Sequence, residues 1–345
     1  MNAELMILSG TSYPGLAKRI CRYLGVELGT AQVITFSNEN IMARIKDNVR
    51  ERDVFLIQTH ASPVNEKIME TLIMLDALKY ASAARITAVL PYFPYGRSDK
   101  KDEPRISIAA RLMADLLETA GADRILTMDL HSPQIQGFSR IPTDQLLAAP
   151  VFFDYFNRYL FTKYPKEEFV LVMADHGASK RFSYFFDELD IPVAIVDKVR
   201  IGHTEKTKVK RVIGKVRGKY ALLVDDEIAS GGTVIEAVNH LLNVEKVKKV
   251  FVSVIHPIFS GSAIQRLKDA PIEKIIVANT VPTESKLDVS EDFVASFNTE
   301  GILYEEGKFV VLDVSRLFAE AIRAIHDGES VSSLFPPSVR RFKER

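Results

Sequence analysis

Short apolar runs alternate with amphipathic helical patterns along almost the whole chain, and this alternation limits the possible folds more than any other feature. The apolar runs, which predict buried strands, span residues 5–8, 54–58, 85–90, 124–128, 169–173, 193–196, 221–224, 250–255 and 274–277. The helical patterns span residues 65–80, 106–119, 233–242 and 314–325. Strands that alternate with helices form mostly parallel sheets with helices on both faces. We therefore predict an α/β protein whose sites lie beyond the carboxyl ends of its strands.

A domain boundary is expected near residues 145–150, where the segment IPTDQLLAAP places two prolines between two similar halves. A chain of 345 residues has room for two domains. We predict a first domain over residues 1–148 and a second over residues 149–312. A C-terminal helix within residues 313–335 is expected to pack back onto the first domain. The likeness of the halves indicates a duplicated α/β unit.

The composition excludes several classes of protein. Lys plus Arg and Asp plus Glu both number 45, so there is no basic excess to favour binding to nucleic acid. The single cysteine, Cys21, excludes an internal disulfide and a multi-cysteine zinc site. No charged-then-apolar leader and no apolar stretch of membrane-spanning length is present, so we expect a cytoplasmic protein with no membrane partner.

Residues 220–233 read YALLVDDEIASGGT and carry the strongest functional signal in the chain. An apolar run is followed by Asp225 and Asp226, then by the loop ASGGT and the helical pattern VIEAVNHLL. The glycines let backbone N–H groups turn toward one point at the positive end of a helix, and the loop hydroxyls add donors. We interpret the loop as a cradle for a phosphate monoester, with the carboxylates beside it for sugar hydroxyls or a metal. A plain strand–turn–helix with a capping hydroxyl is the alternative.

Two further strand ends carry chemistry. His131 follows the strand pattern in TMDLHSPQIQGF, and Asp175 follows the one in VLVMADHG. Alone, each would be read as a capping or packing residue. Together with the phosphate loop they point to a Mg²⁺ site, because magnesium takes few protein ligands and keeps water and phosphate oxygens. The chain contains neither the P-loop nor the dinucleotide fingerprint, so a nucleotide would be bound by other means.

Two charged segments have both a functional and a plain interpretation. In YFPYGRSDK the aromatic rings and Arg97 suit contacts to a base and to phosphate, and the alternative is a proline-rich loop with solvated charges. The stretch at residues 197–219 is the most basic in the chain. It suits a flexible lid that brings Lys198 and Arg200 onto a transferring phosphoryl group, and the alternative is a solvated arm.

Taken in order, these segments resemble the ribose-phosphate pyrophosphokinase family, the synthetases of phosphoribosyl pyrophosphate. The matching segments are RITAVLPYFPYGRSDK, DLHSPQIQGF, VDDEIASGGT, HPIFSG and ESVSSLF, spread over residues 5–335. The resemblance implies two phosphoribosyltransferase-type domains, with the nucleotide on the first and ribose 5-phosphate on the second. It also implies that the diphosphoryl group of Mg-ATP moves to the anomeric hydroxyl of ribose 5-phosphate and that AMP leaves.

The resemblance also assigns roles to residues. Lys198 and Arg200 are implied to be catalytic, and His131 and Asp175 to flank Mg²⁺. The implied ATP contacts are Phe36, Asn38, Asn40, Arg97, Ser98, Asp99 and His131. The implied ribose 5-phosphate contacts are Asp225, Asp226, Ala229, Ser230, Gly231, Gly232 and Thr233. A regulatory site is implied at Arg50, Ser330, Ser332 and Ser333. The implied assembly is a homo-oligomer, a hexamer built from dimers, activated by phosphate ion and inhibited by ADP.

Three segments depart from the family pattern. Ala229 stands where the family loop usually has an aspartate, residues 36–40 read FSNEN instead of F-S-D-G-E, and residues 97–100 read RSDK instead of R-Q-D-R. The last change replaces a bidentate arginine by Lys100. Three alternatives remain open: an active synthetase, a weak or inactive regulatory paralogue, and a pyrophosphokinase for another 5-phosphoribosyl compound. Retention of Lys198, Arg200 and the acid pair favours the first.

Overall fold

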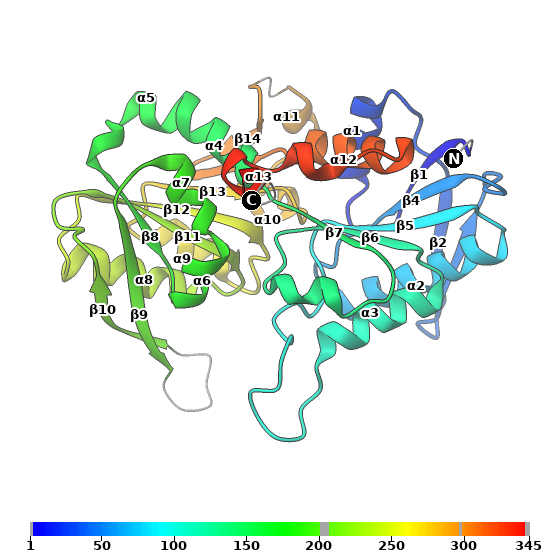
Figure 1. The fold of residues 1–345 in the computed structure, drawn as a ribbon, viewed down its shortest axis with the longest axis horizontal. Coiled ribbons are helices and arrows are strands. Elements are labelled where there is room, and N and C mark those ends of the chain that lie inside the picture. The colour runs from blue at the N-terminus through cyan, green and yellow to red at the C-terminus, as the bar shows by residue number, and fades with distance from the viewer. Residues whose placement is uncertain (1–2, 201–206, 297–298, 342–345) are drawn as a thin grey trace. The chain divides into compact units, whose positions relative to one another are not determined.

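The computed structural model describes residues 3–200, 207–296 and 299–341. The chain divides into two compact units, each with its own sheet (Figure 1). Unit 1 contains Met1–Leu147, Thr280–Pro282 and Ser315–Phe335, and unit 2 contains Ala148–Asn279, Thr283–Val314 and Pro336–Arg345. Each unit is therefore assembled from more than one stretch of the sequence.

Unit 1 is built on a parallel sheet of five strands in the order β1-β4-β5-β6-β7. The strands are β1 (Leu5–Ser9), β4 (Asp53–Ile57), β5 (Arg85–Leu90), β6 (Arg124–Met128) and β7 (Thr143–Leu146). The helices are α1 (Pro14–Leu24), α2 (Val64–Tyr80), α3 (Ala109–Ala120) and α12 (Ser315–Asp327). In Figure 1, α1 and α12 lie on one face of this sheet and α2 and α3 on the other. A separate antiparallel hairpin, β2 (Ala31–Thr35) and β3 (Ile41–Ile45), packs against α2.

Unit 2 is built on an eight-stranded sheet in the order β10-β9-β8-β11-β12-β13-β15-β14. The strands are β8 (Phe169–Met173), β9 (Val193–Arg200), β10 (Thr207–Ile213), β11 (Tyr220–Ile228), β12 (Lys249–Pro257), β13 (Lys274–Ala278), β14 (Ile302–Glu306) and β15 (Phe309–Leu312). Only the outer pairs, β10 with β9 and β14 with β15, are antiparallel. The helices are α4 (Ala149–Tyr155), α5 (Phe161–Lys163), α6 (His176–Arg181), α7 (Ser183–Leu189), α8 (Gly232–Asn243), α9 (Ala263–Asp269), α10 (Glu284–Leu287), α11 (Glu291–Ser296) and α13 (Pro337–Arg341).

The two sheets repeat one topology. The order β8-β11-β12-β13-β15 in unit 2 matches β1-β4-β5-β6-β7 in unit 1, with all of these strands parallel. In both units a helix follows the first strand, a hairpin comes next, and a second helix follows the next parallel strand. The predicted α/β class, with mostly parallel sheets flanked by helices, is therefore confirmed.

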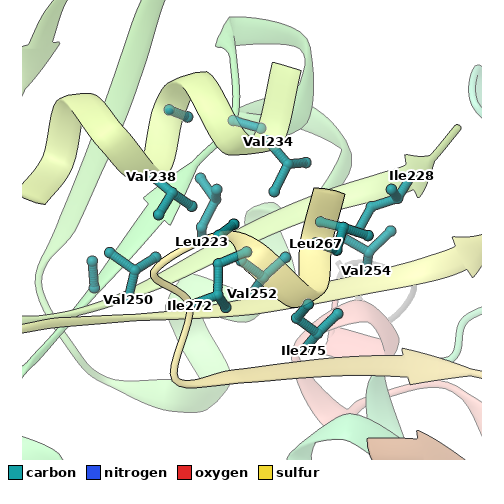
Figure 2. Packing of buried hydrophobic residues seen from close by; sticks show 14 of the residues in the cluster. Leu223, Ile228, Val234, Val238, Val250, Val252, Val254, Leu267, Ile272 and Ile275 are labelled. Atoms are coloured by element: carbon teal, nitrogen blue, oxygen red, sulfur yellow. The ribbon is translucent and has the colours of Figure 1, made fainter. Parts of the chain in front are cut away.

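The core of unit 2 explains why the phosphate-loop helix is held firmly. The buried residues of α8 are Val234, Ala237, Val238 and Leu241, which recur at the spacing of one helix face. Figure 2 shows Val234 and Val238 directed toward the sheet, where Leu223 of β11 and Val252 of β12 lie. Each such side chain, once fully buried, contributes about 1.5–3 kcal/mol to the stability of the fold. The helix start is thereby fixed relative to the end of β11.

The basic stretch at residues 197–219, expected as a flexible lid or solvated arm, contains two paired antiparallel strands, β9 to Arg200 and β10 over Thr207–Ile213, and this pairing decides between neither expectation. Residues 201–206, on which that expectation also falls, lie outside the described residues. The structure corrects one expected boundary. The helix expected from residue 106 begins at Ala109. The amide of Ala110 donates to the Ser98 carbonyl at 3.1 Å, so the residues before α3 belong to a loop closed by Ser98.

The hairpin of β2 and β3 and the strands β7, β14 and β15 were not expected from the sequence. Their apolar runs are short, and the residues of β2 and β3 are exposed or only half-buried, so the pattern carries no long apolar signal.

His60, just after β4, is a fully buried ring in unit 1. Its Nε2 lies 3.1 Å from the Thr71 hydroxyl, and its Nδ1 lies 3.4 Å from the Tyr92 carbonyl oxygen. Burial lowers the pKa of His60 from 6.5 to about 4, against smaller opposing effects of the Tyr92 carbonyl and the Glu70 carboxylate. The ring is therefore neutral in the folded protein at pH values where it would be charged in the unfolded chain.

We predict that acid destabilises the protein through His60. Below pH 6.5 the unfolded chain takes up a proton that the folded protein does not take up until about pH 4, so the free energy of unfolding falls over this window. The loss attributable to His60 approaches about 3 kcal/mol at pH 4. Denaturant titrations at several pH values should show a flatter pH profile for His60→Gln. The control His176→Gln, at a largely exposed ring, should keep the wild-type slope. Equal slopes for wild type and His60→Gln would contradict the prediction.

Candidate functional site

The phosphate loop of unit 2 lies between the end of β11 and the start of α8. Ile228 is the last residue of the strand, and α8 begins at Gly232. Gly231 is the N-cap and has φ of 77°, a left-handed conformation that favours glycine. The first-turn N–H groups of a helix have no intrahelical acceptor and carry the positive end of the helix dipole. The loop can therefore receive an anion at this point, as the sequence predicts.

Asp225 and Asp226 lie within β11, where the sequence had placed them after a strand ending at residue 224. β11 keeps its pairing with β12 to Ile228, whereas its pairing with β8 ends at Val224. The Asp226 amide donates to Asp225 Oδ1 at 3.0 Å. Burial and the neighbouring charge of Asp226 raise the pKa of Asp225 well above its usual value. The acids are therefore strand residues held rigidly beside the loop.

Arg181, at the end of α6, is a partner of the acid pair that sequence reasoning missed. Its Nη2 lies 2.9 Å from Asp226 Oδ1 and 3.9 Å from Asp225 Oδ1, and the guanidinium stacks on the ring of Phe182 at 6.0 Å. Arg181 follows Asp175 by less than two helical turns, which is the only local signal that could have suggested it. The arginine fixes the orientation of Asp226 and balances part of the negative charge.

Lys198, on β9, belongs to the same cluster of charged groups as the acid pair. Burial lowers the pKa of its ammonium, and the charges of Asp225, Asp175 and Glu236 oppose that shift. The Lys198 charge in turn opposes the rise in the pKa of Asp225. A half-buried lysine among carboxylates is suited to neutralise negative charge that develops nearby. Arg200 is the last residue of β9, and its side chain lies outside the described part of the structure.

Asp175 caps α6, the helix that follows β8. Its Oδ1 accepts the amide of Ala178 at 2.6 Å, which is the plain capping role considered for it in the sequence. One oxygen is thus used by the helix, and the charge of the carboxylate still acts on Lys198 and Asp225. Asp175 therefore shares an electrostatic environment with the acid pair, while His131 belongs to unit 1.

A loop after β12 supports the phosphate loop from behind. The amide of Phe259 donates to the Ile228 carbonyl at 3.0 Å, and the amide of Ser260 donates to the Ala229 carbonyl at 2.9 Å. Lys286, from α10, donates to the Ile258 carbonyl, and burial lowers the pKa of its ammonium. No sequence motif marks Lys286, because its contact joins α10 to the loop after β12, and these meet only in the fold.

In unit 1, the predicted nucleotide residues at 36–40 form the turn of the β2–β3 hairpin. The amide of Phe36 donates to the Asn40 carbonyl at 2.8 Å, and the amide of Asn40 donates to Asn38 Oδ1 at 3.2 Å. The Phe36 ring is 49% exposed. An exposed ring at the tip of a hairpin is available to stack on a flat ligand.

The loop after β5 and the loop after β6 meet in unit 1. A Cβ placed on Gly96 would lie 3.8 Å from the Cβ of His131, so Arg97 and His131 are brought near each other. Ser98 has a structural role as well, since its hydroxyl donates to the Ser107 carbonyl at 3.3 Å and its carbonyl accepts from Ala110. The loops that carry Arg97 and His131 thus meet at the carboxyl end of this sheet, where ligands bind in parallel α/β folds, and Asp99 is on the same loop as Arg97.

The predicted regulatory residues lie in two parts of unit 1. Arg50 Nη1 donates to the Ser82 hydroxyl at 3.4 Å. Ser330 caps the short helix η4 (Val331–Leu334), which contains Ser332 and Ser333. The end of α12, just before η4, is fixed to the starts of β4 and β5, because His326 Nδ1 lies 2.7 Å from Asp53 Oδ2 and Arg85 donates to the Ile325 carbonyl at 3.0 Å.

Within residues 3–200, 207–296 and 299–341, no group of three or more His, Cys, Asp and Glu side chains is arranged to hold a metal ion. In the same residues, no helix combines the length and apolar character needed to cross a membrane. A cation in this site would need ligands from its substrates and from water, as magnesium commonly does.

Comparison with known proteins gives full-length matches. Residues 5–121 match the model for the N-terminal domain of ribose phosphate pyrophosphokinase, and residues 192–336 match the phosphoribosyl synthetase-associated domain. Ribose-phosphate pyrophosphokinase of Deinococcus radiodurans is 44% identical over 335 residues, which is 96% of this chain and 98% of that protein. The corresponding protein of Caldanaerobacter subterraneus subsp. tengcongensis is 43% identical over 334 residues, again 96% and 98%.

A solved structure has the same fold over nearly its whole length. The crystal structure of phosphoribosylpyrophosphate synthetase from Mycobacterium smegmatis matches with a TM-score of 0.81 and 37% sequence identity, covering 94% of this chain and 99% of that one.

We predict that Lys286 stabilises the loop behind the phosphate loop. Lys286→Met removes one hydrogen bond, worth about 1 kcal/mol, and should speed amide hydrogen exchange of Phe259 and Ser260 about fivefold. Lys308→Met is the matched control, because Lys308 also donates to a backbone carbonyl, that of Ala270, at the other end of the strands. Unchanged exchange in Lys286→Met, or an equal change in the control, would contradict the assignment.

Proposed function

The chain belongs to the ribose-phosphate pyrophosphokinase family, and from this premise we propose how its own residues act. It is a ribose-phosphate diphosphokinase, an enzyme of nucleotide biosynthesis that forms phosphoribosyl pyrophosphate from ATP and ribose 5-phosphate. The observation that supports these roles best is the joining of an acid pair, a half-buried lysine and a helix N-terminus at the carboxyl end of one sheet.

Ribose 5-phosphate is proposed to bind at the end of β11. The 5-phosphate accepts hydrogen bonds from the first-turn N–H groups of α8 and from the hydroxyls of Ser230 and Thr233. Gly232 keeps the approach to the backbone open, since a Cβ on Gly232 would have only the Ser230 hydroxyl within 4 Å, at 3.8 Å, and Gly231 supplies the left-handed turn at the N-cap. Asp225 and Asp226 accept from the ribose hydroxyls, and Ala229 lies beside them without a charge.

ATP is proposed to bind through unit 1. The exposed Phe36 ring stacks on adenine, and the amides of Asn38 and Asn40 offer donors and acceptors to its edge. Arg97 and His131 contact the phosphates, with Asp99 on the same loop as Arg97. Ser98 holds that loop against α3 by the hydrogen bonds described above.

The donor set fits Mg²⁺, which when bound would neutralise phosphate charge. Asp175 offers a carboxylate whose Oδ1 is already oriented by the Ala178 amide, and His131 offers an imidazole nitrogen. Few protein ligands are needed, because water and the phosphates supply the others.

The transfer itself is a displacement at phosphorus. The anomeric hydroxyl oxygen forms a bond to the β-phosphorus of ATP, the bond from that phosphorus to the α–β bridging oxygen breaks, and AMP leaves with the electron pair. The hydroxyl proton is lost to solvent or to a nearby carboxylate. Lys198 and Arg200 stabilise the charge that develops on the transferred group.

The division of labour and the assembly are also part of the proposal. Unit 1 serves the nucleotide and unit 2 the ribose 5-phosphate, in a cytoplasmic homo-oligomer, a hexamer built from dimers. Arg50, Ser330, Ser332 and Ser333 form a regulatory anion site for phosphate ion and ADP.

We predict ribose 5-phosphate-dependent release of AMP from Mg-ATP by the purified protein, with phosphoribosyl pyrophosphate as the second product in equal amount. The assay is run with and without inorganic phosphate and with other 5-phosphoribosyl compounds in parallel. AMP release that needs a different phosphosugar would favour the alternative substrate, which the alanine at position 229 motivates. No turnover by folded protein that still binds Mg-ATP would favour an inactive paralogue.

We predict that Lys198→Met lowers kcat by at least about 100-fold while the KM values for ATP and ribose 5-phosphate change little, because the lysine acts on charge that develops only in transfer. Lys210→Met, at an exposed residue of the same hairpin, is the control and should keep the wild-type rate. A Lys198→Met enzyme with normal kcat would contradict the proposed role.

A further inference from the structure

Glu236, a carboxylate outside the acid pair, holds β10. This strand pairs with β9, which carries Lys198. The backbone N–H of Val209, in β10, donates to Oε1 of Glu236, in α8, at 2.7 Å. Val209 is the direct cross-strand partner of Lys198 in the hairpin. We infer that Glu236 is a positioning residue for diphosphoryl transfer, which keeps Lys198 in place through this hydrogen bond. The inference rests on the proposed role of Lys198.

The position of the hydrogen bond in the hairpin makes it effective. β10 is the edge strand of the unit 2 sheet, and its register with β9 shifts between Val209 and Arg211. A shift of this kind interrupts the regular ladder of hydrogen bonds at one point. Glu236 supplies an acceptor there, directly opposite Lys198. A helix outside the sheet thus holds β10, and through it β9 with Lys198, at the place where the pairing of β10 with β9 is irregular.

The charge of Glu236 adds to the effect. The Glu236 carboxylate opposes the lowering of the Lys198 pKa that burial causes, as do Asp225 and Asp175. In the proposed reaction Asp225 is engaged with ribose hydroxyls and Asp175 with the cation. Glu236 is then the carboxylate that remains with the lysine when both substrates are bound.

The helix that carries Glu236 also carries the phosphate loop. α8 starts at Gly232, so Glu236 is about one turn from the proposed 5-phosphate contacts. Figure 1 shows α8 close to β10, and Figure 2 shows Val234 and Val238 of the helix directed toward the sheet. A single packed helix therefore sets both the position of the sugar phosphate and the register of β10 against β9, the strand of Lys198.

The test compares three variants with the wild type. Glu236→Ala removes the acceptor and the charge, and we expect kcat to fall about tenfold with KM values for both substrates within about twofold, because small misplacement of a catalytic group is costly. Glu236→Gln keeps an acceptor for the Val209 amide and should stay within about threefold of wild-type kcat. Glu245→Ala, at the far end of α8 beside His240, is the control and should leave kcat unchanged.

A double-mutant cycle separates positioning from general destabilisation. In a Lys198→Met background, measured at enzyme concentrations that resolve the residual rate, Glu236→Ala should cause no further loss, because the group that it positions is gone. Equal loss of kcat in both backgrounds would overturn the inference, and so would equal losses for Glu236→Ala and Glu236→Gln. If Lys198→Met lowers kcat strongly while Glu236→Ala keeps a normal kcat, the inference about Glu236 is overturned and the proposed role of Lys198 stands. A normal kcat in Lys198→Met would instead overturn the proposed function of the lysine.

Discussion

The site in unit 2 depends on unequal pairing of β11 with its two neighbours. The strand is paired with β8 only over Tyr220–Val224, whereas it stays paired with β12 as far as Ile228. This difference leaves a step at the carboxyl edge of the sheet, and Asp225 and Asp226 lie at that step. Backbone hydrogen bonds to β12 hold the acids rigidly, while the end of β8 leaves room for Arg181 and Lys198 to approach. The electrostatic properties of the cluster follow from this local geometry, because the groups are close, partly buried and unable to move apart.

The repeated topology shows how one architecture can be used in two ways. In unit 1 the end of β4 carries Gln58 and Thr59 where β11 carries its acids. The edge beside them is occupied by side chains of the unit itself. Buried Glu70 of α2 accepts the amide and the hydroxyl of Thr11 at 2.6 Å each, and its other partner is Lys67 at 3.1 Å. A carboxylate that already has an amide, a hydroxyl and an ammonium as partners has little capacity for a ligand. In unit 1 the exposed hairpin tip and the loops after β5 and β6 are better placed to meet one.

The sequence predicted most of the parallel strands, though not β7 and β15, because buried strands of this kind are continuous apolar runs with clear ends. It also marked the candidate phosphate loop, whose acids and glycines are adjacent in the chain. It did not locate Arg181, which meets an acid 45 residues away, or Lys286 and Glu236, whose partners are backbone groups of other elements. A backbone partner leaves no trace in residue type, so only the fold can reveal such contacts. The half-buried hairpin of β2 and β3 was missed since an exposed face weakens the apolar pattern.

The discontinuity of unit 1 determines the order in which the protein can be completed as it is made. Helix α12 belongs to unit 1, where it covers α1: Arg323 donates to the Tyr23 and Leu24 carbonyls at 3.1 and 3.2 Å, and Arg19 donates to the Ser315 hydroxyl at 3.3 Å. Until the ribosome has synthesised residues 315–327, α1 lacks the helix that packs against it, although the residues of α1 are among the first to emerge. Nearly all of unit 2 is synthesised before that point. Unit 1, which begins the chain, therefore stays incomplete until nearly all of unit 2 has been made, and a nascent chain interrupted before α12 would leave α1 without this helix against it, open to chaperones and proteases.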